Sequence, residues 1–87
     1  MPRAVINPNV LSKSVLGEEV LLNLETGDYF GLNESASFIW SLLKEISELE
    51  DIPGKVAAKF DIPLAEAESD ASDFIARLEK MKVIECV

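Results

Sequence analysis

The stretch VLLNLETGDYFGLN, residues 20–33, decides the fold of this 87-residue chain. Along its first part aliphatic side chains recur at every second position, which is the period of a β-strand. Gly27 then stands where a tight turn or a G1 bulge requires a positive φ angle, and an aromatic segment follows it. The stretch therefore predicts two antiparallel strands, at 18–25 and 28–32, that are joined by a hairpin.

The segments on either side of this hairpin complete an α+β pattern. A further strand is expected at 10–16, with Gly17 as the turn that leads into the hairpin. After Asn33, a favoured N-cap residue, the spacing of apolar side chains changes from two to 3.6. Helices are expected at 34–46, 52–60 and 64–81, and a short strand or packed tail at 83–87. We predict one domain over residues 1–87, with its core at about 10–85, in which a three-stranded antiparallel sheet precedes three helices and the longest helix covers most of the sheet.

Composition argues against catalysis. The chain contains no histidine, which is the usual near-neutral general base and the commonest metal ligand. Cys86 has neither a histidine nor a second cysteine to lower its pKa or to share a metal ion. The four glycines are too scattered for a phosphate-binding loop. We therefore expect no enzymatic activity, no metal and no cofactor.

Two further features bear on where the protein works. No apolar run reaches the roughly 20 residues of a membrane span, so no membrane contact is expected. The N-terminus lacks the layout of a secretory signal, and a single cysteine cannot form an internal disulfide. These features predict a cytoplasmic protein.

The third predicted strand suggests a binding role. If it forms an edge of the sheet, its unpaired main-chain groups can pair with an added strand. The first strand carries Lys13 and follows Pro8, which discourage such pairing, whereas the third has no lysine or proline. We expect a peptide to add alongside the third strand and to contact Asp28, Tyr29, Phe30, Gly31 and Leu32. Of these, Tyr29 and Phe30 point to opposite faces, and the pattern leaves open which one faces the ligand.

The last helix is the expected wall of the binding cleft. Its apolar stripe is wider than a core contact needs, and charged residues flank it. The side chains expected to bound the cleft are Phe74, Leu78 and Met81, with Asp70, Asp73 and Arg77 at its rim. The alternative is that the apolar residues all belong to the core, above all Ile75 and Leu78.

The sequence closely resembles the PqqD family over about residues 10 to 85. The residues that carry the resemblance are 20–33 with Ala36, Ile39-Trp40 and Leu42-Leu43, and later Phe60-Asp61-Ile62, Ala67, Asp70, Phe74, Leu78 and Val83-Ile84. The resemblance implies a winged-helix-like domain that acts as a recognition element for ribosomally made, modified peptides (RiPPs). In that family the domain binds the leader part of a precursor peptide as an extra strand against the third strand, in the cleft beside the last helix.

The resemblance also implies partners. Family members present the leader to a modifying enzyme, which in the namesake pathway is a radical SAM protein that serves the synthesis of pyrroloquinoline quinone (PQQ). Members that resemble that pathway carry a Pro-Glu-Gly type segment at the hairpin, where this chain has Leu24-Glu25-Thr26-Gly27-Asp28. The hairpin is more similar to stand-alone members that serve lasso peptides or other radical SAM peptide products. The implied function is a non-catalytic peptide chaperone with a leader peptide and a RiPP-modifying enzyme, radical SAM or other, as its partners.

Two other functions compete with this interpretation. The same open edge could pair with its own copy, which would make the chain a structural module that forms a homodimer. A sheet with three helices is also the architecture of winged-helix DNA-binding proteins. Eight Lys and Arg against 16 Asp and Glu give a net charge of −8, however, and phosphate contacts need cationic residues. We therefore expect no nucleic-acid binding and a preference for a basic or weakly charged peptide.

Overall fold

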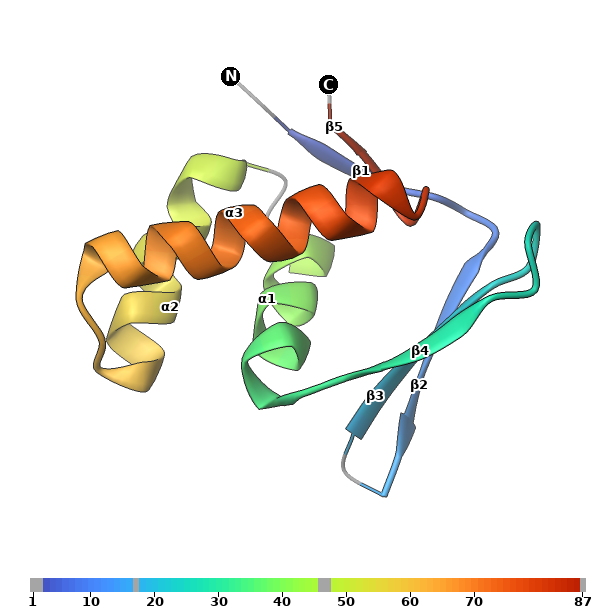
Figure 1. Cartoon of the computed structure of the whole chain (residues 1–87), viewed down its shortest axis with the longest axis horizontal. Helices are drawn as coiled ribbons and strands as arrows, with labels where there is room; N and C mark the ends of the chain where they lie inside the picture. Colours follow the sequence, from blue (N-terminus) through green and yellow to red (C-terminus); the bar gives the residue numbers. More distant parts are fainter. Residues whose placement is uncertain (1–2, 17, 46–47, 87) are drawn as a thin grey trace.

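The computed structural model describes residues 3–16, 18–45 and 48–86. Three positions used in the predictions lie outside these ranges: Gly17, Ile46 and Val87. The predicted α+β class is confirmed, because a three-stranded antiparallel sheet is followed along the chain by three α-helices (Figure 1). A small two-stranded sheet is present in addition.

The main sheet has the strand order β2-β3-β4 and matches the predicted meander. Its strands are close to the predicted ones and span Val10–Val15 (β2), Glu18–Asn23 (β3) and Tyr29–Leu32 (β4). Gly27 has a φ angle of 79°, and its N–H donates a hydrogen bond to the carbonyl oxygen of Asn23 at 2.8 Å. The conformational freedom of glycine is thus required at this turn, as the sequence predicts.

The register of the hairpin fixes which face each side chain occupies. Leu21 lies opposite Phe30, and Leu22 lies opposite Tyr29. Residues that face each other across antiparallel strands point to the same side of the sheet. Leu21 is fully buried, so Phe30 faces the core with it, whereas Tyr29 is 76% exposed on the outer face. The alternation of Tyr29 and Phe30, left open by the sequence, is resolved in this way.

The three α-helices also agree with the sequence pattern. They span Glu34–Glu45 (α1), Ile52–Phe60 (α2) and Leu64–Lys80 (α3). The side-chain oxygen of Asn33 accepts a hydrogen bond from the N–H of Ala36 at 2.8 Å, which confirms the predicted N-cap. A short 3-10 helix, η1 (Leu49–Asp51), runs directly into α2 and was not predicted, because a single polar turn carries no periodic signal.

A second sheet joins the two ends of the described chain. Strand β1 (Ala4–Ile6) pairs antiparallel with β5 (Ile84–Cys86), and Ala4 lies opposite Cys86. The short terminal strand was one of the two alternatives expected for the tail, but no strand was predicted at β1. Ala4 and Ile84 are both buried, so this small sheet adds to the main hydrophobic core. None of the helices in the described ranges has the length and apolar content of a membrane span.

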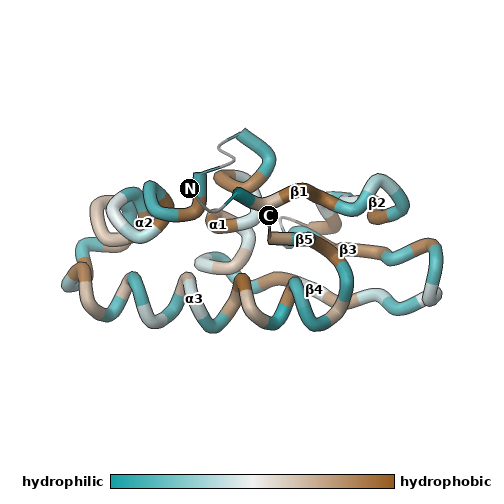
Figure 2. Tube along the Cα trace, turned by 90° about the horizontal axis from the view of Figure 1, so that it is seen from above, coloured by the Kyte–Doolittle hydropathy of each residue, from teal (hydrophilic) through white to brown (hydrophobic). Residues whose placement is uncertain are grey.

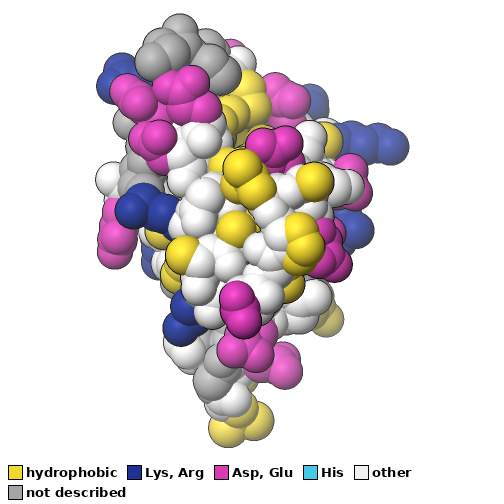
Figure 3. Space-filling model, turned by 90° about the vertical axis from the view of Figure 1, so that its left-hand side faces the viewer, with side chains coloured by type: hydrophobic (Ala, Val, Ile, Leu, Met, Phe, Trp, Pro, Cys, Tyr) yellow, Lys and Arg dark blue, Asp and Glu magenta, His cyan; other side chains and the backbone are white. Residues whose placement is uncertain are grey.

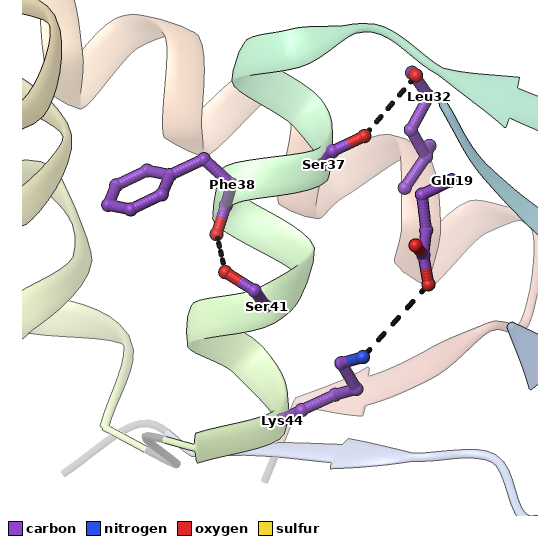
Figure 4. A network of polar contacts seen from close by, with 6 residues as sticks. All are labelled: Glu19, Leu32, Ser37, Phe38, Ser41 and Lys44. Atoms are coloured by element: carbon purple, nitrogen blue, oxygen red, sulfur yellow. Dashed lines mark hydrogen bonds and ion pairs between the residues drawn. The ribbon is translucent and has the colours of Figure 1, made fainter. Parts of the chain in front are cut away.

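Helix α1 packs against the main sheet, and α3 packs along α2 and β5. The hydroxyl of Ser37 donates to the carbonyl oxygen of Leu32 at 3.3 Å, and Lys44 Nζ lies 4.0 Å from a carboxylate oxygen of Glu19 (Figure 4). The expectation that the longest helix covers most of the sheet is therefore wrong. Only Asn33 separates β4 from α1, so the chain turns directly back onto the strands with its first helix.

Candidate peptide-binding site

Strand β4 forms a free edge of the main sheet. The N–H of Asn23 donates to the carbonyl oxygen of Asp28 at 2.8 Å, which makes these two residues a hydrogen-bonded pair. Hydrogen-bonded and non-hydrogen-bonded pairs alternate along an antiparallel ladder. Phe30 and Leu32 therefore direct their main-chain groups toward β3. The N–H and C=O groups of Tyr29 and Gly31 point outward, where an added strand can reach them.

Local chemistry keeps this edge accessible. The segment from Tyr29 to Leu32 carries no charge and no proline. A side chain built on Gly31 would meet no atom within 4 Å, so the strand is open on its outer face at this residue. Asp28 lies at the exposed entrance to the strand, whereas the side chain of Leu32 is buried beneath it. Among the five residues expected in this strand, Leu32 therefore offers a ligand neither its side chain, which is buried, nor its main-chain groups, which face β3.

A cleft of about 290 Å³ lies between the start of α1 and the middle of α3. Four of the residues predicted from the last helix line it together: Asp70, Asp73, Phe74 and Arg77. They recur at helical spacings of three and four and so share one face of α3. Figures 1 and 2 show α3 and β4 on the same side of the molecule. Asn33, which follows β4 directly, is among the lining residues, so the cleft lies next to the end of the edge strand.

The opposite wall of the cleft was not anticipated. It is formed by the residues that cap and begin α1: Asn33, Ser35, Ala36 and Ile39. A signal for them was present in the sequence, because Asn33 directly follows the predicted edge strand and caps the helix that follows. The side-chain oxygen of Asn33 is already used, since it accepts hydrogen bonds from the Ala36 N–H and from the Ser35 hydroxyl at 3.2 Å.

Two predicted cleft residues take other positions. Leu78 is fully buried in the core, so its side chain is not available to a ligand, in line with the alternative stated for it. Met81 is half-buried at the end of α3, packs against the core and does not line the cleft. Sequence periodicity places Phe74 and Leu78 on the same stripe. Only the packing of neighbouring elements determines that Phe74 lines the cleft and that Leu78 lies in the core.

The charges at the cleft are exposed and available. Asp70, Asp73 and Arg77 are all exposed, and Arg77 makes no ion pair within the part of the chain that the structure describes. An exposed guanidinium without an ion pair can donate hydrogen bonds to a carboxylate or a main-chain carbonyl group of a ligand. Figure 3, which views the end of the molecule formed by α2 and the start of α3, shows a group of hydrophobic side chains with acidic and basic ones around it.

The hairpin is held beside the end of α3 by a cluster of asparagines that the sequence analysis missed. The side-chain amide of Asn7 donates to a carboxylate oxygen of Glu25 and to the carbonyl oxygen of Lys82, each at 3.0 Å. Asn9 donates to the same carboxylate at 3.0 Å. Hydrogen bonds from Asn9 and Asn7 lower the pKa of Glu25 below its ordinary value. The link between β1 and β2 thus ties the hairpin to the turn after α3.

The single cysteine is not activated. Burial raises the pKa of the Cys86 thiol, and the neighbouring Glu79 raises it further. The thiolate is the nucleophilic form of cysteine, so this environment opposes such a role. Within residues 3–16, 18–45 and 48–86, no cluster of acidic or cysteine side chains is suited to hold a metal ion. The groups that the site offers to a ligand are an edge strand, an apolar floor and a charged rim.

Comparisons with known proteins agree with this geometry. The family model described as coenzyme PQQ synthesis protein D (PqqD) matches residues 18–84. The solved structure of TbiB1 in complex with the TbiA(beta) leader peptide is 38% identical, with a TM-score of 0.85 over 92% of this chain and 93% of that one. A lasso peptide synthetase B1 complexed with its leader peptide is 19% identical and shares the fold, with a TM-score of 0.86 over 95% and 98% of the two chains. A search of curated proteins gave no significant match. The family match spans most of the sequence and includes both the edge strand and the cleft, and the chain therefore belongs to the PqqD family.

Proposed function

We propose that this chain binds the leader segment of a ribosomally synthesised precursor peptide and presents it to a modifying enzyme. The observation that carries the proposal is the free, uncharged edge of β4 next to the α1–α3 cleft. Main-chain pairing at such an edge gives affinity without a demand on sequence, and adjacent pockets give specificity. TbiB1, the 38% identical relative, is itself bound to a leader peptide.

In this proposal the residues of the site have separate roles. The N–H and C=O groups of Tyr29 and Gly31 pair with the leader backbone as an added strand. Side chains of the leader alternate between two directions. Those that point inward contact Phe74 and the rim of the cleft, where Arg77 donates hydrogen bonds to a carboxylate or carbonyl group of the leader. Those that point outward lie beside the Tyr29 ring.

In this proposal the whole chain acts as one binding unit without chemistry of its own. The modifying enzyme supplies the reaction, and the peptide chaperone raises the local concentration of its substrate. The 38% identity to TbiB1 and the hairpin sequence favour a lasso peptide or a related product over PQQ, and a radical SAM enzyme is one candidate partner. Because the precursor is newly translated when it is bound, the proposed binding step takes place in the cytoplasm.

Titration of the labelled chain with the leader of the precursor encoded beside it tests the proposal. We expect saturable binding with a dissociation constant below about 100 μM, the range of transient interactions. Amide NMR shifts should concentrate at Tyr29 and Gly31 and along the exposed face of α3. An absence of binding at that concentration, or shifts that avoid both β4 and α3, would overturn the proposal.

The free edge of β4 also favours a second candidate, in which two copies of the chain pair edge to edge. Sedimentation of the chain over a range of concentrations separates the two. A dimer that dissociates when leader is added would mean that both ligands use β4. A dimer that persists with bound leader would place the self-contact elsewhere.

A further inference from the structure

The outer face of the main sheet, which points away from the helices, is apolar where a solvated face is normally polar. Antiparallel sheets with one face in water usually alternate hydrophobic-in with polar-out. Here a shallow hollow of about 310 Å³ on the outer face is lined by Leu11, Lys13, Val15, Val20, Leu22 and Tyr29. Leu11 is 53% exposed and Val15 is 45% exposed. We call these six residues the outer patch.

The outer patch follows from the alternation of residues along β2 and does not depend on one side chain. Leu11 lies opposite Leu22, and Lys13 lies opposite Val20, so the odd-numbered residues of β2 point outward. The inward positions between them are Ser12 and Ser14, and both are exposed. The amphipathic pattern of β2 is thus inverted, with apolar side chains toward water and hydroxyls toward the helices. The apolar side chains of such a strand are removed from water, and so contribute free energy, only when another molecule covers the outer face.

Charge argues against a second copy of the chain as the occupant. Lys13 lies on the edge strand β2, between Leu11 and Val15, and is the only charged residue of the outer patch. A two-fold axis that passes near Lys13 would bring the ammonium groups of the two copies together, which is unfavourable. A different protein with an apolar surface and a carboxylate that reaches Lys13 satisfies both features of the patch.

The outer patch is continuous with the edge where the leader is proposed to add. Tyr29 belongs both to the patch and to β4. A strand added to β4 extends the sheet, and every second side chain of that strand then points to the outer face beside the Tyr29 ring. A protein docked on the outer patch would therefore contact the chain and the leader at once.

We propose that the outer patch is the docking surface for the modifying enzyme, and that the bound leader enlarges it. The enzyme is expected to offer an apolar surface with an acidic residue opposite Lys13. This inference rests on the proposed function for its partner, but it concerns a surface that the leader does not need for its own main-chain pairing. Leader binding and enzyme docking can thus be measured separately.

The test uses the purified enzyme encoded beside the chain, with and without the leader peptide. The double variant Leu11→Gln/Val15→Gln removes apolar contacts at β2, away from β4. We expect its affinity for the enzyme to fall about 10-fold or more, as for central apolar contacts of an interface, while its affinity for the leader stays within about two-fold of the unmodified chain. The matched control Ser14→Gln makes the same residue on the opposite face of the same strand and should leave both affinities unchanged.

Lys13→Glu is a second variant that reverses one exposed charge and leaves the apolar residues intact. It should weaken enzyme binding about three-fold or more, with a smaller effect at high salt, because the attraction to a carboxylate becomes repulsion. If the double variant also loses leader binding, Lys13→Glu decides the matter. In that case, an enzyme affinity that is unchanged in Lys13→Glu overturns the inference. If the double variant still binds leader, an enzyme affinity that is unchanged in the double variant overturns it.

The failures of the two proposals are distinguishable. A chain that binds the enzyme through the outer patch but never binds leader would overturn the proposed function and leave the docking surface in place. A chain that binds leader but not the enzyme would overturn the docking surface and the presentation step, and would leave leader binding in place. A homodimer that the double variant dissociates would assign the outer patch to a second copy and overturn the inference as well.

Discussion

The two edge strands of the main sheet, β4 and β2, differ in what lies beside them. Each presents free main-chain groups, on Tyr29 and Gly31 in β4 and, by the same alternation, on Ser12 and Ser14 in β2. Helix α1 begins directly after β4, and the cleft between α1 and α3 includes Asn33, the residue that joins β4 to α1. From Leu11 to Val15 the residues of β2 are all exposed. A free edge becomes a selective site only where a second element adds a pocket.

A matched pair of proline substitutions gives the sharpest test of this difference. Gly31→Pro removes an N–H from the free edge of β4, and the ring obstructs an added strand, so leader affinity should fall about 30-fold or more. Ser12→Pro removes the corresponding N–H from the edge of β2 and should leave leader affinity within about two-fold. Calorimetric titration of both variants with the same leader measures the contrast.

Gly31→Ala is the control for the proline variant at β4. It retains the N–H, and an added Cβ would meet nothing within 4 Å, so binding and thermal stability should both be close to those of the unmodified chain. Equal losses in Gly31→Pro and Ser12→Pro would mean that the proline effect is one of general stability. The distinction between the two edges would then fail.

The charged rim of the cleft should contribute a smaller effect than the edge. Arg77→Gln removes an exposed guanidinium that can donate hydrogen bonds to the leader. Affinity for the leader should fall about five-fold, since solvent weakens such a contact. Lys80→Gln, one turn further along α3 and not in the cleft, changes the same net charge and should have little effect. Fluorescence anisotropy with a labelled leader resolves this difference, and equal losses would assign the effect to net charge.

Salt should have the smallest effect and should act on the association rate. The rim beside β4 holds Asp70 and Asp73, whereas the outer side of β2 holds Lys13. A leader with lysines should therefore associate about three-fold more slowly when ionic strength rises from low to near 0.5 M, as screening shortens the range of attraction. Stopped-flow traces with a lysine-to-glutamine leader serve as the control. A rate for the lysine leader that does not change with salt would contradict the steering of ligand to the β4 side.

The sequence predicted the regions in which local pattern and tertiary structure agree. The hairpin around Gly27 and the capped start of α1 at Asn33 depend on contacts between near neighbours, so their signals are complete within a short stretch. Strand β1 is different, because three residues carry no clear alternation and their partner β5 lies at the other end of the chain. Such a pairing is set by the packed core and not by local preference.

The candidate site divides in the same way. Helical spacing was enough to bring Asp70, Asp73, Phe74 and Arg77 to one face of α3. It could not separate Phe74 from Leu78, since both belong to the apolar stripe and only the neighbouring elements decide which is covered. The outer patch escaped notice because β2 alternates in the opposite sense, and its sense becomes visible only when the register with β3 is known.

The pairing of β1 with β5 has a practical consequence for rearranging the chain. It brings the first and last strands side by side, as Figure 1 shows. A short linker can therefore join the ends, and the chain can be reopened after Leu16, whose side chain is fully exposed. The resulting circular permutant begins with β3 and ends with β2. Its last strand can then be shortened residue by residue, which makes the outer face of the sheet accessible to truncation without a cut through β4 or the helices.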